Sequence, residues 1–207
     1  MKEKLTTVFV VDDDEAVRTS LKLLLRSVGL PVETCTSAQE FLDRFDADRP
    51  GCLVLDIRMP GMSGLELQER LNTMHAMIPV VFITGHGDVP MAVEAMQHGA
   101  VDFIQKPFRD QDLIDRINQA LEKDRENRAG LRERDNIRAH IADLTPREKE
   151  VLDLVTAGKA NKVIAGDLDV SQRTVEIHRA RVMEKMGASS LAHLVRMVIA
   201  AGEDVPT

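Results

Sequence analysis

The residues from 8 to 121 alternate between short apolar runs and longer segments with the periodicity of amphipathic helices. Most of the apolar runs are nearly continuous, as in strands buried on both faces, and the second is more polar: Val8–Val11, Val32–Thr34, Leu53–Ile57, Val80–Thr84 and Val101–Ile104. The helical segments that follow them are Glu15–Val28, Ala38–Phe45, Gly64–Met74, Pro90–His98 and Gln111–Leu121. This alternation predicts a doubly wound α/β fold, a five-stranded parallel sheet with helices on both faces.

After Asp143 the periodicity is purely helical. Thr145 and Glu148 match a capping box, and Pro146 occupies the first helical position, which together indicate a helix start. Further helical segments cover residues 161–168, 172–186 and 190–200. Two helices joined by a short turn match the helix-turn-helix arrangement, so the sequence predicts a second, small all-α domain. Gly166 departs from good helix-forming sequence and costs about 1 kcal/mol relative to alanine.

Between these two regions the chain is rich in charges of both signs and poor in apolar residues. The segment resembles a solvated helix or linker, with Gly130 as its weak point. Two interpretations remain open: a passive spacer, or a coupling helix that extends the last helix of the first domain. The predicted boundaries are 1–123 for the first domain, 124–142 for a charged helical linker and 143–207 for the helical domain.

The net charge of −7 belongs entirely to the first domain. Residues 1–123 hold 13 basic and 20 acidic side chains, whereas residues 124–207 hold 14 of each. This asymmetry suggests that the two domains have different partners, and it favours a cation rather than a nucleic acid for the first.

Several features favour a cytoplasmic protein. No stretch approaches the roughly 18 uninterrupted apolar residues of a membrane span, and the first residues lack the pattern of a signal peptide. Cys35 and Cys52 have neither metal-binding nor redox spacing, so we expect free, buried thiols.

Acidic, hydroxyl and basic side chains stand where the predicted strands end. In open parallel sheets, ligands bind beyond the carboxyl ends of the strands, so we expect these groups to converge. They are Asp12, Asp13, Asp14, Asp56, Thr84 and Lys106. Crowded carboxylates repel one another unless a cation lies among them, and Mg²⁺ takes oxygen ligands. A carboxylate near that ion can attack phosphorus and form an aspartyl-phosphate, while the ion and a lysine neutralise the transferring oxygens.

Four segments resemble the signature regions of response-regulator receiver domains: VVDDDE, LVLDIRMPGMSG, VVFITGHGD and GAVDFIQKPF. The resemblance implies a flavodoxin-like receiver fold, a partner histidine kinase, and Mg²⁺ as cofactor. It implies that Asp56 is the phosphoacceptor. The implied metal ligands are Asp12, Asp13, Asp56 and the backbone carbonyl of Arg58. Thr84 and Phe103 match the switch positions, Lys106 the phosphate-binding lysine, and Lys106-Pro107 the peptide that is cis in the family.

Aspartyl-phosphate phosphatases also use a strand-end aspartate and Mg²⁺. They usually carry a second aspartate two residues after the nucleophile as general acid, and here that position is Arg58. We therefore expect a switch that phosphorylates and dephosphorylates itself slowly, rather than an enzyme.

Residues 144–196 resemble the LuxR-type helix-turn-helix domain of the NarL/FixJ response-regulator family. The resemblance implies that the helix 172–186 lies in the major groove of promoter DNA. Its expected base contacts are Gln172, Arg173, Glu176, Arg179 and Arg181, and its expected phosphate contacts are Lys162 and Lys185. Val175 and Val182 have the spacing of core residues, and Ile177, Met183 and Met186 are further core candidates.

The two halves together predict a phosphorylation-controlled transcriptional regulator, expected to be an activator that works with RNA polymerase. The resemblance implies that phosphorylation produces a homodimer through residues 89–100 and the strand and helix after them. It also implies that the last helix pairs on a two-fold DNA site. The alternative is a receiver-regulated module that docks protein or RNA instead of duplex DNA.

Overall fold

The structure, a computed structural model, describes residues 5–85 and 89–202. The signature segment VVFITGHGD is therefore described only as far as Gly85, and its last residues lie outside the described ranges. The chain divides into two compact units, Met1–Arg128 and Ala129–Thr207. This division falls within the segment 124–142 that the sequence marks as a linker.

The first unit contains a five-stranded sheet in the order β2-β1-β3-β4-β5, with every neighbouring pair parallel. Its strands are β1 (Thr7–Val11), β2 (Val32–Cys35), β3 (Gly51–Asp56), β4 (Val80–Thr84) and β5 (Asp102–Gln105). This topology confirms the predicted fold. Strand order reverses between β1 and β3, and the carboxyl ends of these two strands border the point where ligands bind in such sheets.

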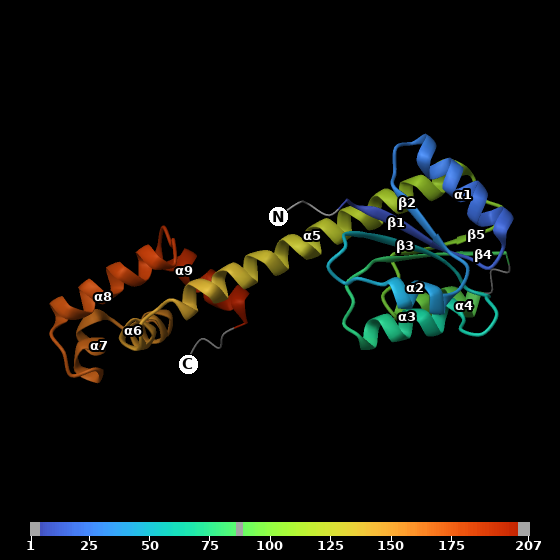
Figure 1. The fold of residues 1–207 in the computed structure, drawn as a ribbon. Coiled ribbons are helices and arrows are strands. Elements are labelled where there is room, and N and C mark those ends of the chain that lie inside the picture. The colour runs from blue at the N-terminus through green and yellow to red at the C-terminus, as the bar shows by residue number, and fades with distance from the viewer. Residues whose placement is uncertain (1–4, 86–88, 203–207) are drawn as a thin grey trace. The chain divides into compact units, whose positions relative to one another are not determined.

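Helices cover both faces of the sheet (Figure 1). They are α1 (Glu15–Ser27), α2 (Ala38–Arg44), α3 (Gly64–Thr73), α4 (Val89–Gln97) and α5 (Asp110–Ala142). Successive strand residues point to opposite faces, which creates two cores. Phe9, Leu53 and Phe82 pack with residues of α2, α3 and α4. Val10 and Val54 pack with residues of α1 and α5.

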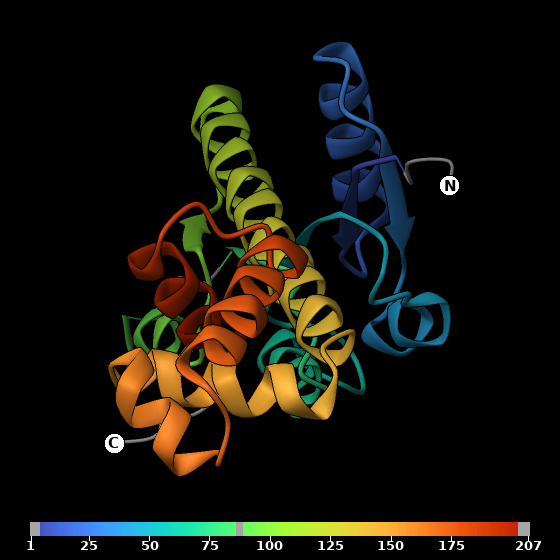
Figure 2. The same cartoon turned by 90° about the vertical axis from the view of Figure 1, so that its left-hand side faces the viewer.

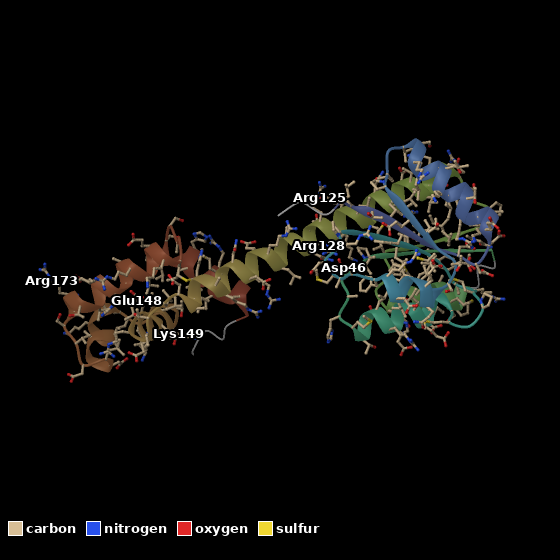
Figure 3. The ribbon with its side chains drawn as sticks, in the orientation of Figure 1. Asp46, Arg125, Arg128, Glu148, Lys149 and Arg173 are labelled. Atoms are coloured by element: carbon tan, nitrogen blue, oxygen red, sulfur yellow. The ribbon has the colours of Figure 1, made fainter. Side chains whose placement is uncertain are left out.

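The helix α5 runs without interruption through the segment that the sequence marks as a linker. Gly130 lies inside it and does not end it. A buried carboxylate fixes α5 to the first unit: Asp124 accepts hydrogen bonds from the Gly51 N–H and the Arg128 guanidinium. Arg128, labelled in Figure 3, also donates to the carbonyl oxygens of Ala47 and Arg49. The sequence pattern gave no sign of this anchor.

The second unit gathers the last four helices around its own apolar core (Figure 2). They are α6 (Pro146–Thr156), α7 (Asn161–Asp167), α8 (Gln172–Lys185) and α9 (Leu191–Ala201). Ile137 and Ile141 of α5 contribute to the same core. The pair α7 and α8 forms the predicted helix-turn-helix, with Asp169 in the left-handed backbone region at the turn. None of the helices in the described ranges is long and apolar enough to cross a membrane.

Candidate functional site

Two of the four carboxylates predicted to converge, those of Asp12 and Asp56, meet at the carboxyl edge of the sheet. Asp12 follows β1 and Asp56 ends β3, and their exposed fractions are only 1 % and 6 %. Lys106, which follows β5, places its Nζ 2.8 Å from Oδ2 of Asp12 and 3.0 Å from Oδ1 of Asp56. One ammonium group therefore bridges two buried carboxylates that come from distant parts of the chain.

Burial makes Asp56 harder to ionise than an ordinary aspartate. Desolvation raises the pKa of its carboxyl group, and Asp12 adds to this, while Lys106 and the Arg58 N–H oppose it. Burial lowers the pKa of Lys106, but the hydrogen bonds and charges of Asp12 and Asp56 outweigh it, so that pKa is raised. The lysine thus stays charged beside a carboxylate whose negative charge is incompletely compensated.

The other predicted receiver residues lie on β4 and β5 or in the segments that follow β1 and β3. Thr84 is buried at the end of β4, and its carbonyl accepts the Lys106 N–H at 2.7 Å. Arg58 is exposed, and its N–H donates to Oδ2 of Asp56 at 2.8 Å. Asp13 is exposed. Phe103 is partly buried, paired in register with Phe82.

Two further details concern this edge of the sheet. The Lys106-Pro107 peptide is cis, as the family resemblance implies. Asp14 caps α1, because its Oδ1 accepts the N–H groups of Ala16 and Val17. The carboxylate of Asp14 is therefore committed to the helix start and not to the cluster around Lys106.

The donor set of this edge fits a hard divalent cation. Among the described residues no three acidic or imidazole groups form a ready-made metal cluster. Mg²⁺ does not require one, because it is usually held by one or two carboxylates and keeps several waters. A cation here would compensate the charge of Asp56 that Lys106 leaves incompletely balanced.

Two residues that shape the site were missed by the sequence analysis. Gly64 begins α3 so close to β3 that a Cβ atom would lie 2.3 Å from the carbonyl oxygen of Asp56. Arg18 of α1 donates from Nη1 to the carbonyl oxygen of Asp12 at 2.7 Å and so fixes the acidic loop. Neither role has a local sequence signal, because each depends on an element packed from elsewhere.

In the second unit, α8 turns one side to the core. Val175, Val182 and Met186 are buried, and Met183 is partly buried. The expectation that Ile177 is another core residue is wrong, since its side chain is 48 % exposed. Ile177 follows Val175 by two residues, which is about 200° around a helix, so it faces the opposite way.

The predicted DNA contacts fall into two groups. Gln172, Arg173, Glu176 and Arg181 of α8 are exposed, as is Lys162 of α7; Arg173 projects outward in Figure 3. Arg179 and Lys185 are half-buried and bonded within the unit. Arg179 Nη1 donates to Oδ1 of Asn161 at 3.0 Å. Lys185 Nζ donates to Glu148 Oε2 at 2.9 Å and to the Asp143 carbonyl at 3.0 Å.

Glu148 locks the end of α8 onto the start of α6. It is buried in the capping box of α6, where its carboxylate accepts the Thr145 N–H. That hydrogen bond and the Lys185 ammonium lower the pKa of Glu148 to about 2. The carboxylate is therefore ionised over the physiological pH range, and the ion pair orients the last turn of α8.

The fold and this edge define a receiver domain, followed by a helix-turn-helix unit. The family model for the response regulator receiver domain matches residues 8–118, and that for bacterial regulatory proteins of the luxR family matches residues 142–198. The chain is 52 % identical to the transcriptional regulatory protein FixJ of Rhizobium meliloti, over 95 % of this chain and 96 % of that protein. It is 50 % identical to Nodulation protein W of Bradyrhizobium diazoefficiens, over 92 % and 84 %.

A solved structure extends the similarity to both units. The response regulator StyR matches with a TM-score of 0.84 and 49 % identity, over 94 % of this chain and 98 % of that one. The chain belongs to the NarL/FixJ family of two-component response regulators. It is a phosphorylation-controlled transcriptional regulator rather than a classical enzyme, with a histidine kinase partner implied by the receiver domain and DNA binding implied by the second. The alternative of a protein- or RNA-docking module is not favoured.

Proposed function

We propose that Asp56 accepts a phosphoryl group from a histidine kinase. The proposal rests above all on the contact of Lys106 with both Asp12 and Asp56 at the carboxyl edge of the sheet. The carboxylate of Asp56 attacks phosphorus, and the bond from phosphorus to the imidazole nitrogen of the kinase breaks. Lys106 lies 3.0 Å from Oδ1 of Asp56, within reach of an oxygen of the incoming phosphoryl group.

The metal ligands in this proposal are Asp12, Asp13, Asp56 and the backbone carbonyl of Arg58. Bound Mg²⁺ would supply positive charge to the phosphoryl oxygens. The side chain two residues after Asp56 is that of Arg58, which cannot act as a general acid. We therefore infer that self-phosphorylation from small donors and self-dephosphorylation are both slow.

Thr84 and Phe103 are the residues that we propose report the modification. Thr84 ends β4 beside the cluster, and Phe103 lies on the neighbouring strand β5. Dimerisation would follow through α4, β5 and α5. Val93 and Met96 support this, because they expose two large apolar side chains one turn apart on α4.

For DNA binding we propose that Gln172, Arg173, Glu176 and Arg181 contact bases and that Lys162 contacts phosphate. We assign Arg179 and Lys185 to holding α8 in place, since both are bonded within the unit. Leu191 and Ile199 expose apolar surface on α9 and support pairing on a two-fold site. The regulator would then activate transcription together with RNA polymerase, in the cytoplasm where the DNA lies.

The test measures DNA affinity with and without phosphorylation. A duplex is selected from a random library with the full chain treated with acetyl phosphate and Mg²⁺. Fluorescence anisotropy then compares wild type, Asp56→Asn and the exposed control Asp48→Asn. We expect acetyl phosphate to tighten binding of wild type and Asp48→Asn by about ten-fold, within the usual range of coupling between sites, and to leave Asp56→Asn unchanged.

Two other outcomes would contradict parts of the proposal. Duplex binding that ignores both acetyl phosphate and the Asp56 substitution would refute the switch and leave DNA binding intact. Retention of RNA in preference to the selected duplex at matched salt concentration would refute the DNA contacts and leave the receiver chemistry intact.

A further inference from the structure

The outward face of α8 has an apolar centre. Ile177 and Ala180 are both exposed, and Ile177 lies about 180° from Met186 and about 140° from Val182, which face the core. Arg173 and Arg181 are one turn before and one turn after Ile177, within about 40° of it around the helix. Two arginines therefore flank an isoleucine at the middle of the exposed surface.

A single exposed apolar side chain is common and by itself requires no explanation. Ile177 differs because the residues that hold α8 against α6, α7 and α9 are already supplied by its opposite side. Ile177 also lies in the first half of a helix whose N-terminal residues contact base edges in helix-turn-helix proteins. Its branched side chain therefore lies on the surface that would face the floor of the major groove.

Resting on the proposed DNA contacts, we propose that Ile177 recognises a thymine through its 5-methyl group. In the major groove only thymine presents a methyl group, and apolar side chains distinguish it by contact. Ala180, one turn away, leaves space beside Ile177, so a methyl group can approach without a clash. Arg173 and Arg181 would read or anchor the flanking positions, and Ile177 would set the preference for a T·A pair between them.

The test uses the duplex selected with the full-length protein, remade with single thymines replaced by uracil. Uracil keeps the hydrogen-bonding edge and removes only the methyl group. Wild type is expected to lose about four-fold in affinity per half-site at one or two thymines, which corresponds to burial of one methyl group. Ile177→Ala should bind the thymine duplex more weakly and lose nothing further with uracil at those positions.

Leu131→Ala is the matched control, because Leu131 is an exposed apolar residue of the same unit outside α8. It should respond to uracil as wild type does. If no thymine methyl affects wild-type binding, or if uracil weakens wild type and Ile177→Ala equally, the proposal is overturned. Wild-type binding to the unmodified duplex is measured in the same series, so a failure of DNA binding is distinguished from a failure of the methyl contact.

Discussion

In the first unit the side chains that we propose for phosphorylation and metal binding, Asp12 and Asp56, are buried. In the second unit the side chains that we propose for DNA binding, Arg173, Glu176 and Ile177, are exposed. The first unit holds charged groups in a buried environment, where electrostatic interactions are stronger than in water. In the same environment a carboxylate without a compensating charge is unfavourable. In the second unit the core holds one side of α8, and the opposite side, to which we assign the DNA contacts, is exposed. Substitutions at the first site should therefore change stability and chemistry together, and those on the second should change binding alone.

The largest effect is expected for Gly64→Ala. The added methyl group would lie 2.3 Å from the carbonyl oxygen of Asp56, so either α3 or the end of β3 must move. We expect the free energy of unfolding of the first unit to fall by about 3 kcal/mol, the upper part of the range for overpacking, and phosphorylation by acetyl phosphate to slow. Calorimetry and phosphate incorporation measure both. Unchanged stability would contradict this expectation and would show that α3 can move away from β3 at little cost in free energy.

Arg173→Ala, in contrast to Gly64→Ala, should change ligand binding and leave the stability of its unit unchanged. We expect affinity for the selected duplex to fall by about ten-fold, a typical effect of losing an arginine contact to a base, with no change in thermal unfolding. Arg132→Ala, an exposed arginine on α5, controls for the lost charge. Equal losses in the two variants would indicate that Arg173 acts through net charge only.

Glu148→Gln tests whether α8 depends on a buried ion pair. The pKa of Glu148 is lowered from 4.5 to about 2, so its ionisation stabilises the folded state above about pH 4.5. That contribution is lost as the pH falls toward about 2. Glu148→Gln should therefore lower the Tm by a few degrees at pH 7 and flatten the acid side of the Tm profile. Glu184→Gln, an exposed residue of α8, should leave the profile as in wild type.

The smallest effect is expected for Gly166→Ala. Nothing lies within 4 Å of a Cβ atom built at this helical position. We expect the second unit to gain up to about 1 kcal/mol of stability, the difference in helix propensity between the two residues, with DNA affinity unchanged. Glycine-to-alanine substitution would then lower the stability of the first unit at Gly64 and raise the stability of the second unit at Gly166. A loss of stability at Gly166 would point to a packing role for this glycine.

The fold and much of the carboxyl edge of the sheet could be predicted because their signals are local and repeated. Apolar runs marked the strands, and parallel strands bring their carboxyl ends to one edge, which placed Asp12, Asp56 and Lys106 together. The face of α8 was less predictable. Ile177 is apolar, as core residues usually are, so its type alone suggests burial. Only the packing of the neighbouring helices determines which side of α8 is buried. For the same reason Arg179 and Lys185 could not be recognised as internally bonded.

The sequence by itself determined that the chain has a doubly wound sheet, a helical second domain and a cluster of strand-end carboxylates. These three features follow from the periodicity of apolar residues and from the order in which strands and helices succeed one another along the chain. Only the tertiary structure decided that Lys106 bridges Asp12 and Asp56, that Asp124 and Arg128 anchor α5, and that Ile177 is exposed. Each of these depends on side chains from elements distant in sequence, whose distances and burial are fixed only when the elements pack.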